Sequence, residues 1–301
     1  MRIVSLLPAA TEIVAALGLS DALVGVSHEC DFPPDVTAKP RVTHCEIHGA
    51  GLASDTVDRW VRERLPAAGS LYTLDEPLLR ALAPDVLLTQ GLCDVCAPSL
   101  ESVTAVAARL PGPPRVLSLD PRTVGDILAD VARVGAAVGA ADRAAAVVAA
   151  LEERIAAVRR RVAGRPVRRC VLLEWIDPPF RSGHWDPELV ALAGGVELLG
   201  RSAEPATAVE WDVVRTAAPD ALVIACCGYD VARTLADVPL LRARPGWAAL
   251  PAVRTGDVWV VDGSAYFSRP GPRVVDSLEL LAWILHPDGA PPVGDAAVRV
   301  G

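Results

Sequence analysis

Two stretches of the sequence, ALAPDVLLTQ at residues 81–90 and TAAPDALVIA at residues 216–225, repeat one pattern. Each combines the end of a predicted helix, the tripeptide Ala-Pro-Asp and an apolar run that is typical of a buried strand. Strand-like and helix-like segments also alternate along nearly the whole chain, which indicates βα units with mainly parallel sheets. Because the repeat occupies equivalent places in the two halves, we predict an α/β fold with two lobes of similar topology.

The segment between the two halves, residues 141–163, contains no glycine or proline and is rich in strong helix formers. As one helix it would extend about 35 Å and limit the relative motion of the parts that it joins. We therefore predict an N-terminal lobe at 1–138, a connecting helix at 139–164 and a C-terminal lobe at 165–301. Within the first lobe, residues 42–72 have a less regular pattern, with a short amphipathic stretch around 56–65.

The composition is that of a folded globular protein, with 51% apolar and 22% charged residues. A net charge of −8 predicts no basic surface for phosphate groups, so we expect no nucleic-acid partner. The first apolar run, up to Pro8, is shorter than the about 7–15 residues of a signal-peptide core. On this basis we expect a cytoplasmic protein, or a periplasmic or cell-surface one if the true start lies upstream.

Four stretches of the chain are distinctive: RIVSLLPAATEIVAALGL (2–19), LVGVSHECDFP (23–33), EWIDPPFRSGHWDPELVALAGG (174–195) and YFSRPGPRVVDSLELLAWIL (266–285). In them the chain resembles the cobalamin and iron-siderophore binding proteins of ABC importers, closest to the cobalamin-binding branch. The resemblance implies two Rossmann-like lobes joined by one long rigid helix, with the ligand in a cleft between the lobes. It therefore implies a non-catalytic solute-binding protein for a corrinoid or another metal-bearing ligand.

The candidate ligand-binding residues follow predicted strands, because ligands of parallel α/β sheets bind beyond the carboxyl ends of the strands. The resemblance adds the loop at 178–183 and the segment 266–269, where the family's tryptophan is replaced by Tyr266. Aromatic faces with a few polar groups suit a large planar macrocycle. The predicted set is Pro8, Thr11, Glu174, Trp175, Phe180, Ser182, His184, Trp185, Tyr229, Tyr266, Phe267 and Arg269.

Two members of this set have alternative roles. Glu174 closes a predicted strand, and it could accept a hydrogen bond from the ligand or hold the backbone of a loop. His184 could contact the ligand by a hydrogen bond or through the ligand's metal, or it could be a solvated loop residue.

The resemblance also implies one acidic residue on each lobe that docks onto arginines of an importer membrane subunit. The corresponding positions are Glu76 and Asp212, each at the start of the helix that precedes one copy of the repeat. Glu76 is slightly offset from the family pattern, and position 212 carries Asp where the family has Glu. The predicted partners are thus a corrinoid-like small molecule and an importer membrane subunit.

The chain has seven cysteines, and the pair in CDVC at residues 93–96 directly follows a predicted strand. Cys30 follows the neighbouring predicted strand, so Cys30, Cys93 and Cys96 could form one metal site. Thiolates bind zinc, iron–sulfur clusters or a corrinoid cobalt, although buried cysteine is also an ordinary small apolar residue. A dithiol redox pair would need Cys93 at a helix N-terminus. His44, Cys45 and His48 have ligand-like spacing as well.

Signatures of common enzyme classes are missing from the sequence. No Gly-x-Gly-x-x-Gly opens a helix after the first predicted strand, and neither a Walker loop nor a Gly-x-Ser-x-Gly elbow occurs. We therefore predict a binding protein that is not an enzyme and that requires no cofactor. The first alternative is a cytosolic metalloprotein that holds an iron–sulfur cluster or zinc through the three cysteines. The second is an enzyme that acts on a cleft-bound substrate with that metal.

Overall fold

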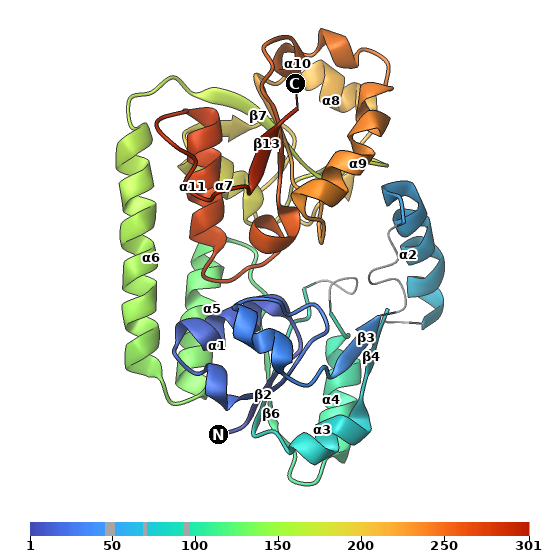
Figure 1. Ribbon diagram of the computed structural model, residues 1–301, viewed down its shortest axis with the longest axis vertical. Helices are drawn as coiled ribbons and strands as arrows, with labels where there is room; N and C mark the ends of the chain where they lie inside the picture. The colour runs from blue at the N-terminus through green and yellow to red at the C-terminus, as the bar shows by residue number, and fades with distance from the viewer. Residues whose placement is uncertain (46–51, 69–70, 93–96, 301) are drawn as a thin grey trace. The chain divides into compact units, whose positions relative to one another are not determined.

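The computed structural model of the chain describes residues 1–45, 52–68, 71–92 and 97–300, without the side chains of 66–68. The chain forms two compact units, each with helices around a central sheet (Figure 1). This arrangement confirms the predicted α/β fold class. Unit 1 comprises Met1–Leu52, Thr56–Pro121 and Asp126–Ala149, and unit 2 comprises Ala53–Asp55, Arg122–Gly125 and Ala150–Gly301.

Unit 1 is built on four parallel strands in the order β2-β1-β5-β6. Successive residues of β1 pack on opposite faces, because side chains alternate along a strand. Ile3 packs in the core with α1 and α5, and Val4 packs in the core with α3 and α4. The elements are β1 Ile3–Ser5, α1 Pro8–Ala16, η1 Ser20–Ala22, β2 Leu23–Val26, η2 Pro34–Ala38, α3 Glu76–Leu82, β5 Val86–Thr89, α4 Leu100–Arg109, β6 Arg115–Ser118 and α5 Val124–Ala137.

The stretch 42–72 is more regular than its sequence pattern indicates. It contains the helix α2, Ser54–Ala68, which is longer than the predicted amphipathic stretch. The strand β3, Thr43–Cys45, pairs antiparallel with β4, Tyr72–Leu74. Each of these strands has three residues, which is too short to show a two-residue period in the sequence.

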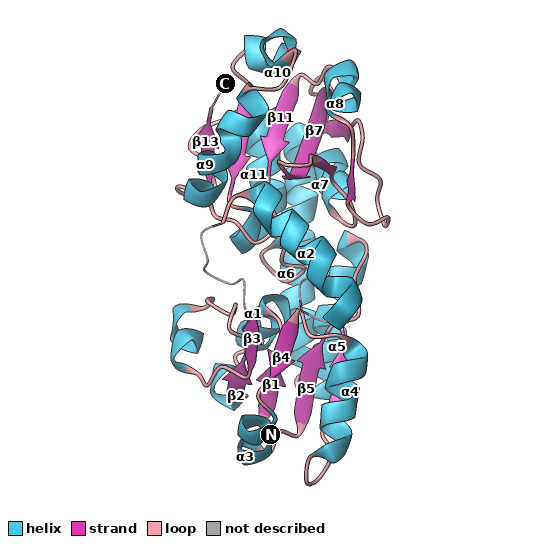
Figure 2. Cartoon of the chain, turned by 90° about the vertical axis from the view of Figure 1, so that its right-hand side faces the viewer, coloured by secondary structure: helices cyan, strands magenta, loops and turns pink. Residues whose placement is uncertain are grey.

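Unit 2 contains a larger, mixed sheet with the order β10-β8-β7-β11-β12-β13 and with β9 beside β7. Figure 2 labels its strands β7, β11 and β13. The strands β7, β9, β11 and β12 are parallel, whereas β8, β10 and β13 pair antiparallel. The sequence predicted β7, β11 and β12, but not the short strands. The elements are β7 Arg168–Trp175, β8 Phe180–Arg181, α7 Asp186–Leu192, β9 Gly195–Glu197, β10 Thr207–Ala208, α8 Trp211–Ala217, β11 Ala221–Ile224, α9 Val231–Arg242, η3 Trp247–Ala249, α10 Pro251–Arg254, β12 Val258–Val261, η4 Gly263–Phe267, α11 Val274–Leu285 and β13 Ala297–Arg299.

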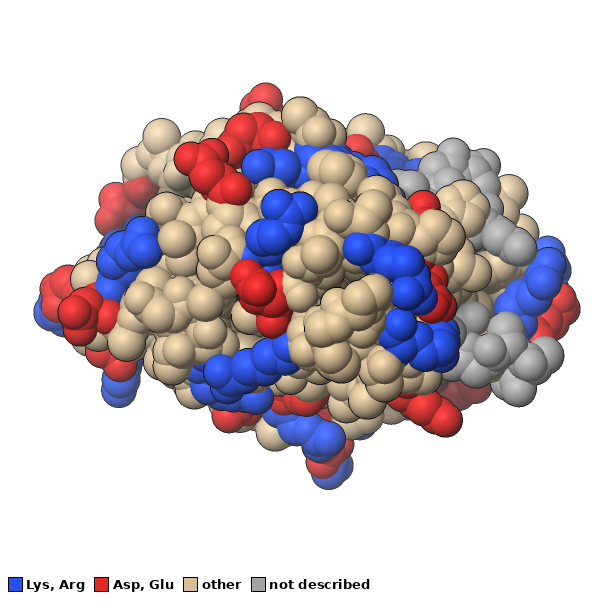
Figure 3. All heavy atoms as spheres, turned by 90° about the horizontal axis from the view of Figure 1, so that it is seen from below, with Lys and Arg blue, Asp and Glu red and all other residues tan. Residues whose placement is uncertain are grey.

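The predicted long helix is α6, Ala141–Val162. Its last turn carries Arg159, Arg160 and Arg161, which complement the negative end of the helix dipole. The division between the two units falls inside this helix, after Ala149, so the predicted domain limits at 138 and 165 stay a prediction. Throughout the described part of the chain, helices that combine the length and the apolarity needed to cross a membrane are absent. On the face shown in Figure 3, Lys and Arg side chains lie among Asp and Glu side chains.

Candidate functional site

The carboxyl edge of the sheet in unit 2 carries a group of aromatic side chains. The parallel strands β7, β11 and β12 all end at this edge, and the segments that follow them bring Trp175, Tyr229 and Tyr266 to it. The rings of Trp175 and Tyr229 are tilted by 47° with their centroids 4.8 Å apart. All three side chains are partly exposed, so they offer apolar ring surface to a ligand.

Two arginines that the sequence analysis missed contact these tyrosines. The Arg233 guanidinium lies 4.3 Å from the Tyr229 ring centroid and donates to the Tyr229 hydroxyl at 3.3 Å. The Arg273 guanidinium lies 5.3 Å from the ring centroid of Tyr266. Tyr229 precedes Asp230, the N-cap of α9, and lies outside the helix, so its spacing of four residues from Arg233 gave no helix-face signal. Cation–π contacts of this kind hold both rings in place.

Burial raises the pKa of both tyrosine phenols. It raises the pKa of Tyr229 to about 12, although the charge of Arg233 acts in the opposite direction. Burial also raises the pKa of Tyr266, again against the charge of an arginine, Arg273. At neutral pH both residues therefore present a neutral ring and a hydroxyl rather than a phenolate.

The predicted loop after β7 divides into buried and partly exposed residues. Ser182 and Trp185 are buried, and the Trp185 indole donates to the backbone carbonyl of Phe267 at 3.0 Å. Phe267 is itself only 1% exposed and belongs to the interior of unit 2. Phe180 and His184 are partly exposed. Of the predicted residues in this stretch, Phe180 and His184 are thus the ones whose side chains a ligand could reach.

His184 has an unusual backbone and a neutral side chain. Its φ of 49° lies in the left-handed region, which a non-glycine residue adopts only when its surroundings hold it there. Its ring stacks on Trp185 with the centroids 5.6 Å apart. Burial, helped by the charge of Arg122, lowers the pKa of His184, so its imidazole is uncharged at neutral pH.

Glu174 contacts the loop backbone, as one of its two predicted roles requires. Its Oε1 accepts a hydrogen bond from the Gly183 N–H at 2.7 Å. Arg269, predicted beside the ligand, is 6% exposed and donates to the Ser264 hydroxyl at 3.3 Å. Both residues therefore contribute to the shape of the edge.

The predicted residues of unit 1 lie at the carboxyl edge of its own sheet. Pro8 is the first residue of α1 and is partly buried, whereas Thr11 is fully buried. The Thr11 Oγ1 lies 3.1 Å from the Cys30 Sγ. Cys30 is only 1% exposed. The structure thus brings Thr11 and Cys30 together.

Cys93, Cys96 and His48 lie outside the described residues, so the metal site of Cys30, Cys93 and Cys96 stays a prediction. Within the described ranges, no three His, Cys, Asp or Glu side chains are grouped to hold a metal ion. In β3, His44 is exposed and Cys45 is buried, because neighbouring strand residues point to opposite faces.

The two predicted docking residues differ in their surroundings. Glu76 begins α3 and accepts hydrogen bonds from Arg109 at 2.7 Å and from Arg80 at 3.3 Å. The Arg109 contact lowers the pKa of Glu76. Asp212, in the first turn of α8, has a side chain that is 77% exposed and is paired only with Arg215, at 3.0 Å, among the described side chains. It lies on an open groove of about 580 Å³ that is also lined by Leu198, Leu199 and Val213.

Comparison with known proteins agrees with the fold and identifies the family. The family described as "Periplasmic binding protein" matches residues 3–265. The chain belongs to this family. It is 26% identical over 288 residues to the vitamin B12-binding protein of Vibrio cholerae serotype O1, covering 92% of this chain and 86% of that protein. The predicted family resemblance is therefore confirmed.

Solved structures of periplasmic binding proteins share the fold. A periplasmic heme binding protein from Pseudomonas aeruginosa superposes with a TM-score of 0.73 at 20% identity, over 100% of this chain and 99% of that chain. The periplasmic vitamin B12 binding protein of Vibrio cholerae gives a TM-score of 0.65 at 22% identity, over 94% and 96%. Because the family is named for a periplasmic location, the cytoplasmic expectation finds no support in these matches.

Proposed function

We propose that this member of the periplasmic binding protein family captures a corrinoid of the cobalamin type reversibly, without making or breaking a bond. The observation that carries the proposal is the aromatic group of Trp175, Tyr229 and Tyr266 at the carboxyl edge of unit 2. The vitamin B12-binding relative from Vibrio cholerae supports the same class of ligand.

The chemistry of the aromatic group suits a large macrocycle whose metal needs no ligand from the protein. Rings and arginine stems bury apolar area, and a few hydroxyl groups can orient the amide groups at the rim of a corrin. The raised pKa values of Tyr229 and Tyr266 extend the pH range in which both phenols stay neutral above the ordinary tyrosine pKa of about 10. Both tyrosines would then bind by contact area and hydrogen bonds.

The proposal includes a location and a partner. A periplasmic protein of this family would deliver its ligand to the membrane subunits of an ABC importer. Asp212 is exposed and, among the described side chains, would give up one contact, with Arg215, in order to dock. Glu76 would have to give up its contacts with two arginines, Arg80 and Arg109. We therefore expect Asp212 to contribute more to docking than Glu76.

Titration of the purified protein with cyanocobalamin and, separately, with hemin tests the ligand. We expect cyanocobalamin to quench tryptophan fluorescence with a defined stoichiometry. Trp175→Ala and Tyr229→Ala should each weaken its binding about 30-fold, because truncation of a central aromatic contact costs about 2 kcal/mol. Trp283→Phe is the matched control, since Trp283 of α11 packs on Trp259, 5.2 Å away, and should leave the affinity unchanged.

Three outcomes would contradict parts of the proposal. Saturable binding of hemin without binding of cyanocobalamin would replace the corrinoid by heme. Binding of neither would remove the tetrapyrrole class. Iron or zinc that copurifies with the protein under anaerobic conditions, and that is lost in a Cys93→Ser/Cys96→Ser variant, would favour the metalloprotein alternative.

A further inference from the structure

Two acidic side chains of unit 2 meet behind the loop that carries the predicted ligand residues. Glu174 lies near the end of β7, and Asp186 is the first residue of α7. The two side chains are hydrogen-bonded to each other, and Asp186 is only 3% exposed. Glu174 also accepts the Gly183 N–H at 2.7 Å, while the Asp186 N–H donates to the Gly183 carbonyl at 3.1 Å. Both acids are thus connected to one residue of the loop.

A hydrogen bond between two carboxyl groups requires that one of them keeps its proton. Two neighbouring carboxylates repel each other, and burial makes the second negative charge still more costly. Asp186 Oδ1 is buried without a hydrogen-bond partner among the described residues, so an ionised Asp186 would bury an unsatisfied charge. Asp186 is therefore the protonated member, and Glu174 is the carboxylate that accepts from both Asp186 and Gly183.

The groups around Asp186 favour the same assignment. Burial raises the pKa of Asp186 well above its ordinary value, and the charge of Glu174 raises it further. Cys227, after β11, and Glu197 of β9 act in the same direction. The acids of α11, Asp276 and Glu279, are bound to Arg154 of α6 instead.

The loop cannot move at Gly183 without losing other contacts. A Cβ at this position would lie 2.3 Å from the Ala206 backbone nitrogen, so the loop backbone packs directly on residues 204–206. The His184 N–H donates to the Glu204 carbonyl at 2.6 Å. The contacts of Glu174 and Glu204 therefore hold the backbone at Gly183 and His184, whereas Phe180 is held by the pairing of β8 with β7.

We infer that Asp186 and Glu174 are positioning residues that share one proton and hold the loop 178–185 in its ligand-binding shape. Asp186 acts through Glu174, and Glu174 acts through the Gly183 backbone. Loss of the shared proton leaves both Glu174 and Asp186 negatively charged, and their repulsion weakens the contact of Glu174 with the Gly183 backbone. The inference rests on the proposed function only for its binding readout, because the loop itself can be followed without a ligand.

The direction of the pH dependence follows from the raised pKa. The folded protein holds the proton of Asp186 more tightly than the unfolded chain does, so the pair stabilises the fold fully at acidic pH. This contribution declines as the pH rises through the pKa of the folded protein. We therefore expect loosening of the loop on the alkaline side.

The test measures Trp185 fluorescence and the affinity for cyanocobalamin between pH 6 and 10, in the full chain and in its variants. In the unsubstituted protein, the fluorescence of Trp185, assigned by difference from a Trp185→Phe variant, should shift at alkaline pH. The affinity for cyanocobalamin should fall by about tenfold, the change that one unit of pKa shift produces. Asp186→Asn keeps a donor to Glu174 but cannot ionise, so both profiles should become flat. Glu210→Gln, an exposed acid-to-amide change in the same unit, should keep the profile of the unsubstituted protein.

Variants of Glu174 separate a positioning role from a merely structural one. Glu174→Gln still accepts from Gly183 and leaves Asp186 as the one member of the pair that can ionise, so its alkaline loss of affinity should be smaller than in the unsubstituted protein. Glu174→Ala loses the hold on Gly183 and should bind at least about tenfold more weakly at every pH, with its fold verified by circular dichroism. An unchanged alkaline shift in Asp186→Asn would overturn the inference.

A measurement on the unsubstituted protein covers the case in which Asp186→Asn does not fold. With ¹³C-labelled aspartate, one side-chain carboxyl should remain protonated at a pH at which Asp130, with a pKa of about 6, has ionised. Absence of a protonated aspartate at this pH would overturn the inference. If neither cyanocobalamin nor hemin binds, the proposed function fails, whereas the fluorescence and the carboxyl signal still decide this inference.

Discussion

The two Ala-Pro-Asp copies have nearly the same backbone, one in each unit. Ala83 ends α3 with φ 40° and ψ 63°, and Ala218 ends α8 with φ 45° and ψ 62°. Both are alanines in the left-handed region, which costs a non-glycine residue about 1–2 kcal/mol. A buried proline follows in each copy. The same strained turn therefore leads into β5 of unit 1 and β11 of unit 2.

The hydrogen bonds around the two copies also correspond. Asp85 accepts from the Arg2 N–H at 2.7 Å, and Asp220 accepts from the Arg169 N–H at 3.3 Å. In return, both aspartate N–H groups donate to the carbonyl of the same arginine at 2.8 Å. Each arginine side chain donates at 2.7 Å to the carbonyl of the residue before the left-handed alanine.

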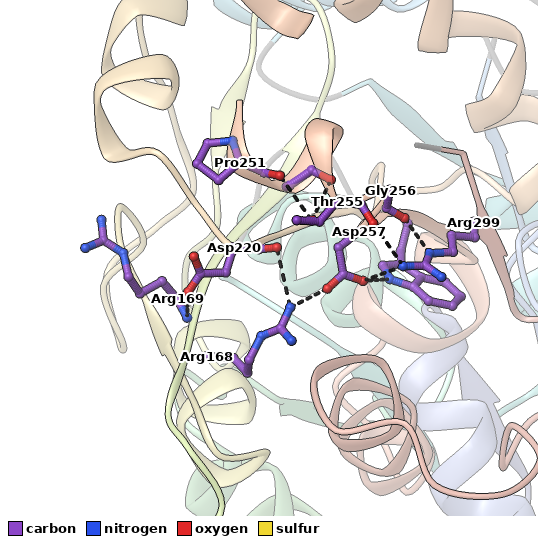
Figure 4. A network of polar contacts seen from close by, with 10 residues as sticks. Arg168, Arg169, Asp220, Pro251, Thr255, Gly256, Asp257 and Arg299 are labelled. Carbon is purple, nitrogen blue, oxygen red and sulfur yellow. Dashed lines mark hydrogen bonds and ion pairs between the residues drawn. The ribbon is translucent and has the colours of Figure 1, made fainter. Parts of the chain in front are cut away.

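The units differ in what surrounds this shared core. Unit 2 adds a network at the amino ends of its strands, where Asp257 contacts the Arg168 and Arg299 side chains and accepts from the Trp259 indole at 2.9 Å (Figure 4). At the carboxyl ends, β1 leads within two residues into α1, whereas β7 extends to Trp175 and a loop. The repeat thus supplies one equivalent strand to each sheet, β5 and β11. The additions in unit 2 supply most of the candidate ligand residues and the network of Asp257, Arg168, Arg299 and Trp259, which we call the clasp.

The largest expected effect comes from removing the clasp, which only unit 2 has among the described residues. Asp257→Ala removes the carboxylate partner of Arg168 and the acceptor of the Trp259 N–H, while Arg168 keeps a contact with the Asp220 carbonyl at 3.5 Å. We expect a loss of about 2 kcal/mol in the free energy of unfolding, less than for a fully buried ion pair because the Arg168 side chain is 31% exposed. Urea denaturation measures it, and Asp257→Asn, which keeps an acceptor, should lose about half. A loss below about 1 kcal/mol would show that the clasp contributes little.

A smaller effect should come from the aspartates of the repeat, in both units. Asp85→Ala and Asp220→Ala each remove one acceptor of a backbone N–H and should destabilise their unit by about 1 kcal/mol. Amide exchange at Arg2 and Arg169 should accelerate about fivefold in the corresponding variant. Asparagine at either position should preserve the protection. Acceleration in only one of the two variants would break the equivalence of the copies.

The smallest expected effect is a gain. Ala83→Gly and Ala218→Gly relieve the left-handed strain but increase the freedom of the unfolded chain, so each should stabilise by about 0.5 kcal/mol. Ala81→Gly, inside α3, is the control and should destabilise by about 1 kcal/mol. Melting temperatures of the three variants measure the difference. Destabilisation by both turn variants would mean that the alanine methyl groups make contacts that outweigh the strain.

Much of this fold could be predicted from the sequence, because the signals are local. The apolar runs at 86–89 and 221–224 are strands, and a segment without glycine or proline is the helix α6. The strands β8, β9 and β10 have two or three residues each, which leaves no period to read. β8 and β9 form because the longer strand β7 offers its edge to them, and β10 pairs in turn with β8.

The site was predictable only in part. Strand ends and the family resemblance placed Trp175, Tyr229 and Tyr266 correctly at the carboxyl edge of the unit 2 sheet, but residue type does not reveal which aromatic side chain is buried. Trp185 and Phe267 lie inside unit 2, since the indole of one donates to the backbone carbonyl of the other. Arg233 and Arg273 went unnoticed because their partners are identified only by side-chain geometry.

The sequence by itself determined the βα rhythm, the repeated Ala-Pro-Asp turn and the family, since each depends on short-range patterns or on direct resemblance. Only the tertiary structure decided which side chains share an environment. Glu174 and Asp186 stand twelve residues apart with a loop between them, and nothing local indicates that they form a hydrogen bond. Their pairing arises because β7 and α7 pack together and bury Asp186 fully and Glu174 partly, and this difference in burial decides which of them keeps its proton.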